Sequence, residues 1–299
     1  KYTVTGHGSD SLGCCEFLSK NYSVILNGST IATRAIWKTC GMNELYPQSG
    51  TWLYDRANWC PGERTNSYFY DFPGVSAGSN YFFGLQFEAY TGAGSLGIYT
   101  SEATLFNYGA LNKTLDASVE DIIAPTNDEN HFRENPISAK PIIRIKNRGS
   151  STITAISFQY GVVGASMQTY NWSGSLAPLQ DSVIVLPDLD TLHWTAGTTG
   201  LNTFVVNITS VNGGEDADGS NNTMHSDFVS APLWDGQFRI IFRTNQEPIT
   251  TGSTVSETKW EIYDINENIV ASRTGGAINT TYIDTVTLPT GSYRFQLTD

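Results

Sequence analysis

The stretch Thr203-Phe204-Val205-Val206-Asn207-Ile208 is a short run rich in β-branched and aromatic residues, and similar runs recur between turn residues along the whole chain. Runs of four to six residues have the length of strands in β-sandwiches. No convincing amphipathic helix interrupts them, and Asn27-Gly28 is the strongest hairpin signal. The sequence therefore predicts an all-β fold. Further examples of such runs are residues 22–26, 142–145, 182–186 and 238–242.

Composition divides the chain into three predicted segments, as a length of 299 residues allows. Residues 1–112 are rich in aromatic residues and contain every cysteine. Residues 116–232 hold about seven candidate strands and are predicted to form one immunoglobulin-like β-sandwich. Residues 236–299 offer only about five strands, too few for a secure sandwich, and are predicted to be a partial β-domain.

The charge of the chain excludes some partners. Formal net charge is -12 at pH 7, so the protein repels phosphate backbones, and we expect no nucleic-acid partner. No apolar run reaches the roughly 18 residues of a membrane-spanning helix, and we expect no membrane span. Lys1 is not an initiator methionine, so we expect the sequence to belong to a longer or processed chain.

The four cysteines point to an oxidising compartment. Cys40 and Cys60 bracket a loop rich in Gly, Pro and Asn, and we predict a disulfide between them. Closing that loop is worth about 3 kcal/mol. For the adjacent Cys14 and Cys15 three alternatives stay open: a vicinal disulfide, a partner outside this chain, or free buried thiols. No paired CxxC pattern exists, so neither a structural metal nor a cofactor is expected.

Four segments form a rare pattern in the first 62 residues: Gly6-His7-Gly8, Gly13-Cys14-Cys15-Glu16-Phe17, Cys40-Gly41-Met42-Asn43 and residues 50–62. The last of them contains W-x-x-D-R-x-x-W-C-P-G. Together they resemble the second lobe of the peptide-N-glycosidase F family, secreted bacterial amidases that remove N-linked glycans from asparagine. In that family two jelly-roll lobes flank the active site. The resemblance implies that residues 1–112 are an incomplete jelly-roll lobe.

The resemblance also implies roles for individual residues. Glu16 matches a glutamate that assists catalysis, and Arg56 matches an arginine of the active-site cleft. His7, Trp52, Asp55 and Trp59 become candidates for substrate contacts. The principal catalytic aspartate belongs to the first lobe, which the resemblance places outside residues 1–299. We therefore expect this chain alone to be inactive as an amidase.

Two departures from the family pattern affect the surroundings of the glutamate. Leu18 stands where the family has the second cysteine of a C-x-x-x-C bridge, and Cys15 stands where it has alanine. A structural interpretation therefore competes with each catalytic role. Glu16 is then an ion-paired glutamate on an inherited scaffold, Asp55-Arg56 a loop-stabilising ion pair, and His7 a turn histidine.

An acidic loop covers residues 212–222 of the predicted sandwich. Asp216, Asp218 and Asn221 offer oxygen atoms at intervals typical of calcium loops, although the distant glutamate of an EF-hand is missing. The loop also resembles the acidic hairpin before the last strand of CARDB-like bacterial surface domains. A solvated turn without metal is the alternative interpretation.

Two functions follow from these observations. The first is the C-terminal region of a secreted or surface bacterial glycosylasparagine amidase, with a glycoprotein or glycan as substrate. The second is a non-catalytic surface scaffold, an adhesion module or a glycan-binding subunit that meets other surface proteins. Both place the protein outside the cell or on its surface.

Overall fold

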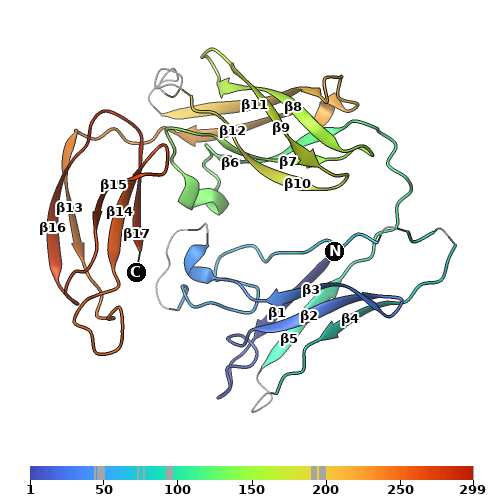
Figure 1. Cartoon of the computed structure of the whole chain (residues 1–299), viewed down its shortest axis with the longest axis horizontal. Helices are drawn as coiled ribbons and strands as arrows, with labels where there is room; N and C mark the ends of the chain where they lie inside the picture. Colours follow the sequence, from blue (N-terminus) through green and yellow to red (C-terminus); the bar gives the residue numbers. More distant parts are fainter. Residues whose placement is uncertain are drawn as a thin grey trace. The chain divides into compact units, whose positions relative to one another are not determined.

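The structure is a computed structural model that describes residues 1–43, 45, 51–72, 74–76, 78–91, 97–189, 194 and 200–298. Its regular structure is almost entirely β-strand, as predicted (Figure 1). Contacts group the chain into two compact units: Lys1–Ala110 with Asp128–Arg133, and Leu111–Asn127 with Glu134–Asp299. In the described part of the chain, no helix has the length and apolar character needed to cross a membrane. The short 3-10 segments are η1 (Cys40–Met42), η2 (Glu129–Glu134) and η3 (Gly219–Asn221).

The first unit contains two small antiparallel sheets. One has the order β1-β5 and the other the order β3-β2-β4. Asn27 and Gly28 join β2 to β3 with φ values of 50° and 83°, the left-handed conformation that a two-residue hairpin turn requires. The predicted hairpin is confirmed. The strands are β1 (Tyr2–His7), β2 (Lys20–Leu26), β3 (Ser29–Ile36), β4 (Phe83–Phe87) and β5 (Ile98–Ala103).

Aromatic residues fill much of the core of the first unit. Tyr2 and Tyr22 are buried with ring centroids 4.8 Å apart in an edge-to-face contact. The fully buried cluster is small and includes Ala57, which belongs to the last of the four motif segments. The motif therefore forms part of the core. The other buried members are Val4, Val24 and Ile36.

The second unit begins with a two-sheet sandwich. One sheet has the order β10-β7-β6 and the other the order β12-β11-β8-β9, and Figure 1 shows them as two layers. Alternate residues of β11 are buried (Asn202, Phe204, Val206 and Ile208), as the run 203–208 predicts for a strand with one face in the core. The strands are β6 (Ala117–Ala124), β7 (Ile142–Asn147), β8 (Ile153–Val162), β9 (Gln168–Leu176), β10 (Asp181–Val185), β11 (Leu201–Val211) and β12 (Thr223–Val229).

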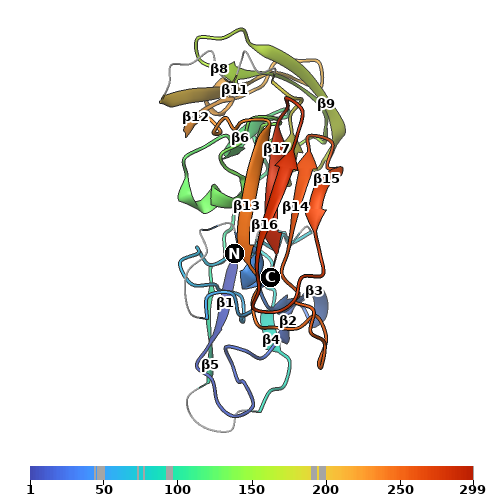
Figure 2. The same ribbon diagram turned by 90° about the vertical axis from the view of Figure 1, so that its left-hand side faces the viewer.

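Residues 237–298 add two further sheets of order β13-β16 and β15-β14-β17, and these strands face the viewer in Figure 2. Their own buried cluster contains only Trp260, Ile262 and Val286. Contacts group these strands with the sandwich in one unit, so the division into domains 116–232 and 236–299 stays a prediction. The strands are β13 (Gln237–Arg243), β14 (Lys259–Asp264), β15 (Ile269–Arg273), β16 (Thr281–Thr287) and β17 (Tyr293–Thr298).

Candidate functional site

Three of the four motif segments meet around the backbone of Glu16. The carbonyl oxygen of Gly8, just after β1, accepts hydrogen bonds from Cys15 N at 3.0 Å and from Glu16 N at 2.9 Å. On the other side, Ala57 N donates to the carbonyl oxygen of Glu16 at 2.8 Å, and Gly6 N donates to Ala57 O at 3.0 Å. Glu16 is therefore held between the end of β1 and residues 56–58.

Arg56 lies directly against Glu16. Its Nε donates to Glu16 Oε1 at 2.9 Å, and the arginine side chain is 3% exposed. Nη1 donates to the carbonyl oxygen of Tyr54 at 2.7 Å and to that of Trp52 at 3.4 Å, while Nη2 donates to Thr51 O at 2.7 Å. All three guanidinium nitrogens thus have acceptors inside the protein. Such a buried, multiply bonded arginine orients a carboxylate instead of reaching out to a ligand.

Only one oxygen of the Glu16 carboxylate is used in this way. Oε2 has no hydrogen-bond partner among the described residues, and the side chain is 19% exposed. An ionised carboxylate accepts several hydrogen bonds, so Oε2 can take one from a ligand hydroxyl or amide.

Aromatic rings pack next to the Glu16–Arg56 ion pair. The Arg56 guanidinium lies 5.1 Å from the ring centre of Trp59 and 5.3 Å from that of Phe17. Trp59 in turn packs on His7 with ring centroids 5.4 Å apart, and the imidazole Nε2 shares a hydrogen bond with Thr5 Oγ1 at 2.7 Å. The structure therefore brings Glu16, Arg56, Trp59 and His7 into one continuous group.

The other two candidates from the motif have different surroundings. Asp55 Oδ1 accepts a hydrogen bond from Cys40 N at 3.1 Å, at the start of η1. The proposed Asp55-Arg56 ion pair is wrong, because the guanidinium pairs with Glu16 instead. The Trp52 side chain is partly exposed, and its carbonyl oxygen serves Arg56. Gly50, the first residue of that motif segment, lies outside the described residues.

Both cysteine pairs are bonded. Cys40 and Cys60 form the predicted disulfide, with Cα atoms 5.4 Å apart. Cys14 and Cys15 form a vicinal disulfide, the first of the three alternatives, and both residues are fully buried.

One ion pair near the site was missed by sequence reasoning. Lys38 Nζ lies 2.5 Å from Glu63 Oε1, and Glu63 Oε2 is buried without a described partner. Lys38 also pairs its backbone with that of Arg56. Lys38 and Glu63 are 25 positions apart. No sequence motif connects them, so the sequence alone contains no signal for this ion pair.

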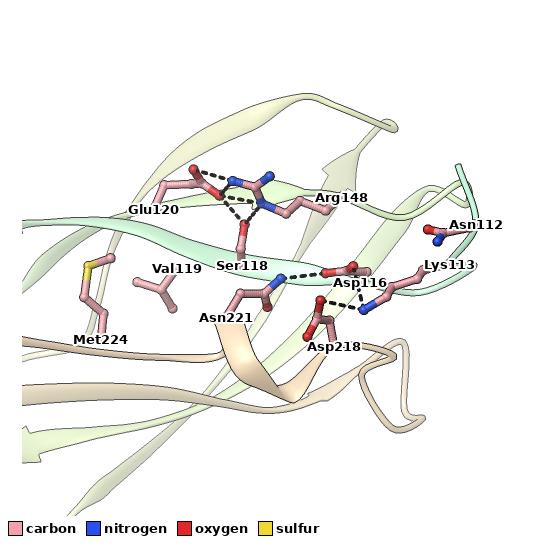
Figure 3. Close-up of a pocket in the computed structure, with 10 residues that line it drawn as sticks. All are labelled: Asn112, Lys113, Asp116, Ser118, Val119, Glu120, Arg148, Asp218, Asn221 and Met224. Carbon is pink, nitrogen blue, oxygen red and sulfur yellow. Dashed lines mark hydrogen bonds and ion pairs between the residues drawn. The ribbon is translucent and has the colours of Figure 1, made fainter. Parts of the chain in front are cut away.

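The acidic loop of the sandwich uses its carboxylates to hold its own backbone. Asp216 accepts from the amides of Ala117 and Asp218, both at 2.8 Å. Asp218 accepts a hydrogen bond from Ser220 N. It also pairs with Lys113 (Figure 3), whose Nζ lies 2.5 Å from Asp218 Oδ2. Hydrogen bonds from Lys113 and Ser220 lower the pKa of Asp218 to about 2.

Of the three calcium candidates, Asp218 therefore already pairs with an ammonium group, that of Lys113. Asn221 Nδ2 donates to Asp116 Oδ1 at 3.0 Å, beside a pocket of about 560 Å³ (Figure 3). Within the described residues, no group of three or more His, Cys, Asp or Glu side chains is placed to hold a metal ion. The donor set fits a lysine-neutralised turn better than a calcium loop. Calcium binding by Asp216, Asp218 and Asn221 stays an untested prediction.

Solved structures similar to this chain include two single domains. One is a domain of a Methanosarcina acetivorans protein whose description assigns it to the cell surface. Its sequence is 20% identical, the match covers 40% of this chain and 95% of that one, and the TM-score is 0.29. The other is the CARDB domain of a Pyrococcus furiosus protein in complex with di-metal ions. Its sequence is 14% identical, the match covers 44% of this chain and 99% of that one, and the TM-score is 0.25. No curated protein sequence matches significantly. Residues 1–102, however, match the family model described as Peptide-N-glycosidase F, C terminal, and so confirm the resemblance that the motif segments predict.

Proposed function

We propose that residues 1–102 form the glycan-contacting side of an extracellular glycosylasparagine amidase site, with Glu16 as its assisting carboxylate. One observation carries the proposal: the Glu16 carboxylate is bound through Oε1 by a buried arginine and keeps Oε2 without a described partner. The family match over the same residues supports it. The catalytic role of Glu16 is taken from the resemblance.

The reaction gives each residue of the group a task. Hydrolysis adds water to the side-chain amide carbon of the glycosylated asparagine, breaks the C–N bond, and leaves aspartate and a glycosylamine. Glu16 Oε2 would accept a hydrogen bond from a sugar hydroxyl or from the departing nitrogen. Trp59 and His7 would offer a ring surface to an apolar sugar face. No residue of this sequence is assigned the role of the family's principal aspartate.

Binding of a glycopeptide tests the proposal. We expect the chain to bind an asparagine-linked glycopeptide measurably by calorimetry. Glu16→Gln should weaken binding by about tenfold, because a charge-assisted hydrogen bond is worth roughly 1.5–3 kcal/mol. Glu88→Gln is the matched control, since Glu88 lies in the same unit, is exposed and pairs with Lys20. Equal affinity of wild type and Glu16→Gln, or no binding at all, would refute the role of Glu16.

Mass spectrometry of the glycopeptide tests the chemical step. The full natural protein should convert the glycosylated asparagine to aspartate, and its Glu16→Gln variant should lose most of this conversion. Persistent asparagine in the wild-type reaction would contradict the amidase function while leaving glycan binding intact.

Location outside the cytoplasm is part of the proposal. Both disulfides require an oxidising compartment to form and persist. The net charge of -12 suits a soluble extracellular surface. Glycoproteins and other surface proteins would be accessible as partners there.

A second candidate, a non-catalytic glycan-binding scaffold, is favoured by the internal bonding of Arg56. Because every guanidinium nitrogen already has an acceptor in the protein, the arginine has little left to stabilise a developing charge. This candidate predicts glycopeptide binding without turnover in the full natural protein. A measured loss of conversion in Glu16→Gln would exclude it.

A further inference from the structure

The vicinal disulfide lies immediately before the candidate carboxylate in the chain. Cys14 and Cys15 are both fully buried. Two glycines pack against their backbone: a Cβ on Gly6 would lie 2.0 Å from Cys15 O, and a Cβ on Gly97 would lie 2.1 Å from Cys14 O. Neither glycine can carry a side chain unless this part of the backbone moves. The bridged dipeptide is therefore tightly enclosed by the backbone beside it.

Hydrogen bonds close the loop around the bridge. Asp10 Oδ1 accepts from Leu12 N at 2.8 Å and from Cys14 N at 3.1 Å, and Phe17 N donates to Gly13 O at 3.0 Å. Glu16 follows the bridge directly, and its amide shares the carbonyl oxygen of Gly8 with that of Cys15. The backbone of Glu16 is thus held together with that of Cys15 by Gly8, and also by Ala57 N, which donates to the Glu16 carbonyl oxygen.

The two partners of the ion pair are fixed by different means. Arg56 is held by the carbonyl oxygens of Thr51 and Tyr54, independently of the glutamate. Glu16 has no comparable side-chain anchor beyond Arg56 itself. The position of its carboxylate therefore depends on its own backbone, which Gly8 and Ala57 hold by hydrogen bonds. The covalent bond between the two preceding side chains limits the freedom of that backbone further.

We propose that Cys14 and Cys15 are positioning residues whose bridge, packed between Gly6 and Gly97, sets the Glu16 carboxylate against Arg56. The inference rests on the proposed function only in taking Glu16 as the group that meets the glycan. Its geometric content concerns the ion pair and can be measured without any ligand.

Nuclear magnetic resonance of the Arg56 Nε–Hε group in the full chain measures the pair directly. Glu16→Gln identifies this signal and gives the reference shift of an arginine that has lost its carboxylate partner. In C14A/C15A the signal should move to this reference, while backbone amides of β2 and β4 keep their wild-type shifts. An Arg56 signal that stays at the wild-type position in folded C14A/C15A overturns the inference.

A second variant decides the question if C14A/C15A does not fold. Glu16→Asp keeps the charge and the disulfide but shortens the side chain by one methylene. A carboxylate fixed by the bridge cannot follow Arg56, so the Nε–Hε signal should again move to the Glu16→Gln position. An unchanged signal would show an adaptable loop and overturn the inference.

Glycopeptide binding separates this inference from the proposed function. If both hold, folded C14A/C15A should lose affinity by the same factor as Glu16→Gln. If no glycopeptide binds even to the wild type, the proposed function fails, and the Arg56 signal still tests the positioning role.

Discussion

Two arginine–glutamate pairs in this molecule have the same chemistry and different surroundings. Arg148 faces Glu120 on the sandwich with two bonds, from Nε to Oε1 at 2.9 Å and from Nη2 to Oε2 at 3.0 Å, and its side chain is 48% exposed (Figure 3). Arg56 is buried, and Nε is the one guanidinium nitrogen that donates to Glu16. The exposed pair therefore satisfies both carboxylate oxygens, and the buried pair leaves Glu16 Oε2 without a partner among the described residues.

The cores around the two pairs differ as well. Among its described residues, the sandwich buries twenty in one hydrophobic cluster, and it contains neither disulfide. The described part of the first unit buries six residues in its cluster and contains both disulfides. A small apolar core gains much of its rigidity from cross-links and buried polar bonds. Polar side chains such as Arg56 should consequently matter more to the first unit than to the second.

Replacing each arginine by alanine gives the largest expected contrast. Arg56→Ala leaves Glu16 and three backbone carbonyls without their donor, and we expect the first unit to lose about 3–5 kcal/mol of unfolding free energy. Arg148→Ala should cost about 0–1 kcal/mol, as exposed pairs do. Hydrogen exchange of β2 and of β8 in urea measures the two units separately. Similar losses in both variants would remove the distinction.

Removing the long-loop disulfide should have the next largest effect. Cys40 and Cys60 are 20 residues apart and enclose Asp55 and Arg56. The C40A/C60A variant should destabilise the first unit by about 3 kcal/mol, because the unfolded chain regains the freedom of that loop. Exchange rates in β8 and β11 should stay unchanged. A loss shared equally by both units would contradict the view that the bridge serves only the smaller core.

Local features of the sequence predicted much of this architecture. The run 203–208, the turn at Asn27-Gly28 and the Cys40–Cys60 loop each depend on residues close together in the chain, where strand alternation, turn conformation and loop length act directly. The segments around Glu16 and Arg56 are two separate stretches of the chain, and they were located from the family resemblance.

The other contacts at the site join residues that are far apart in the sequence, and no local sequence pattern predicts such contacts. Glu16 lies 40 residues from Arg56, so sequence adjacency favoured the wrong partner, Asp55. The sequence also left the state of Cys14 and Cys15 open, because it does not show that Gly97, more than 80 positions away, packs against their backbone. Lys113, which lies before β6 in the chain, pairs with Asp218, so one candidate metal ligand is already the partner of an ammonium group.

The smallest expected effect concerns pH and the Lys113–Asp218 pair. The pKa of Asp218 falls from 3.8 to about 2, because Lys113 and Ser220 bond the ionised form in the folded protein. A carboxyl whose folded pKa is depressed stabilises the protein above its unfolded pKa and loses that contribution as the pH falls from about 4 to about 2. Asp218→Asn should therefore flatten the decline in stability of the sandwich within this window. Glu215→Gln, an exposed change in the same loop, controls for net charge. Acid unfolding curves that coincide for wild type and Asp218→Asn would show that Lys113 does not hold this carboxylate in solution, and the loop would again be open to a metal ion.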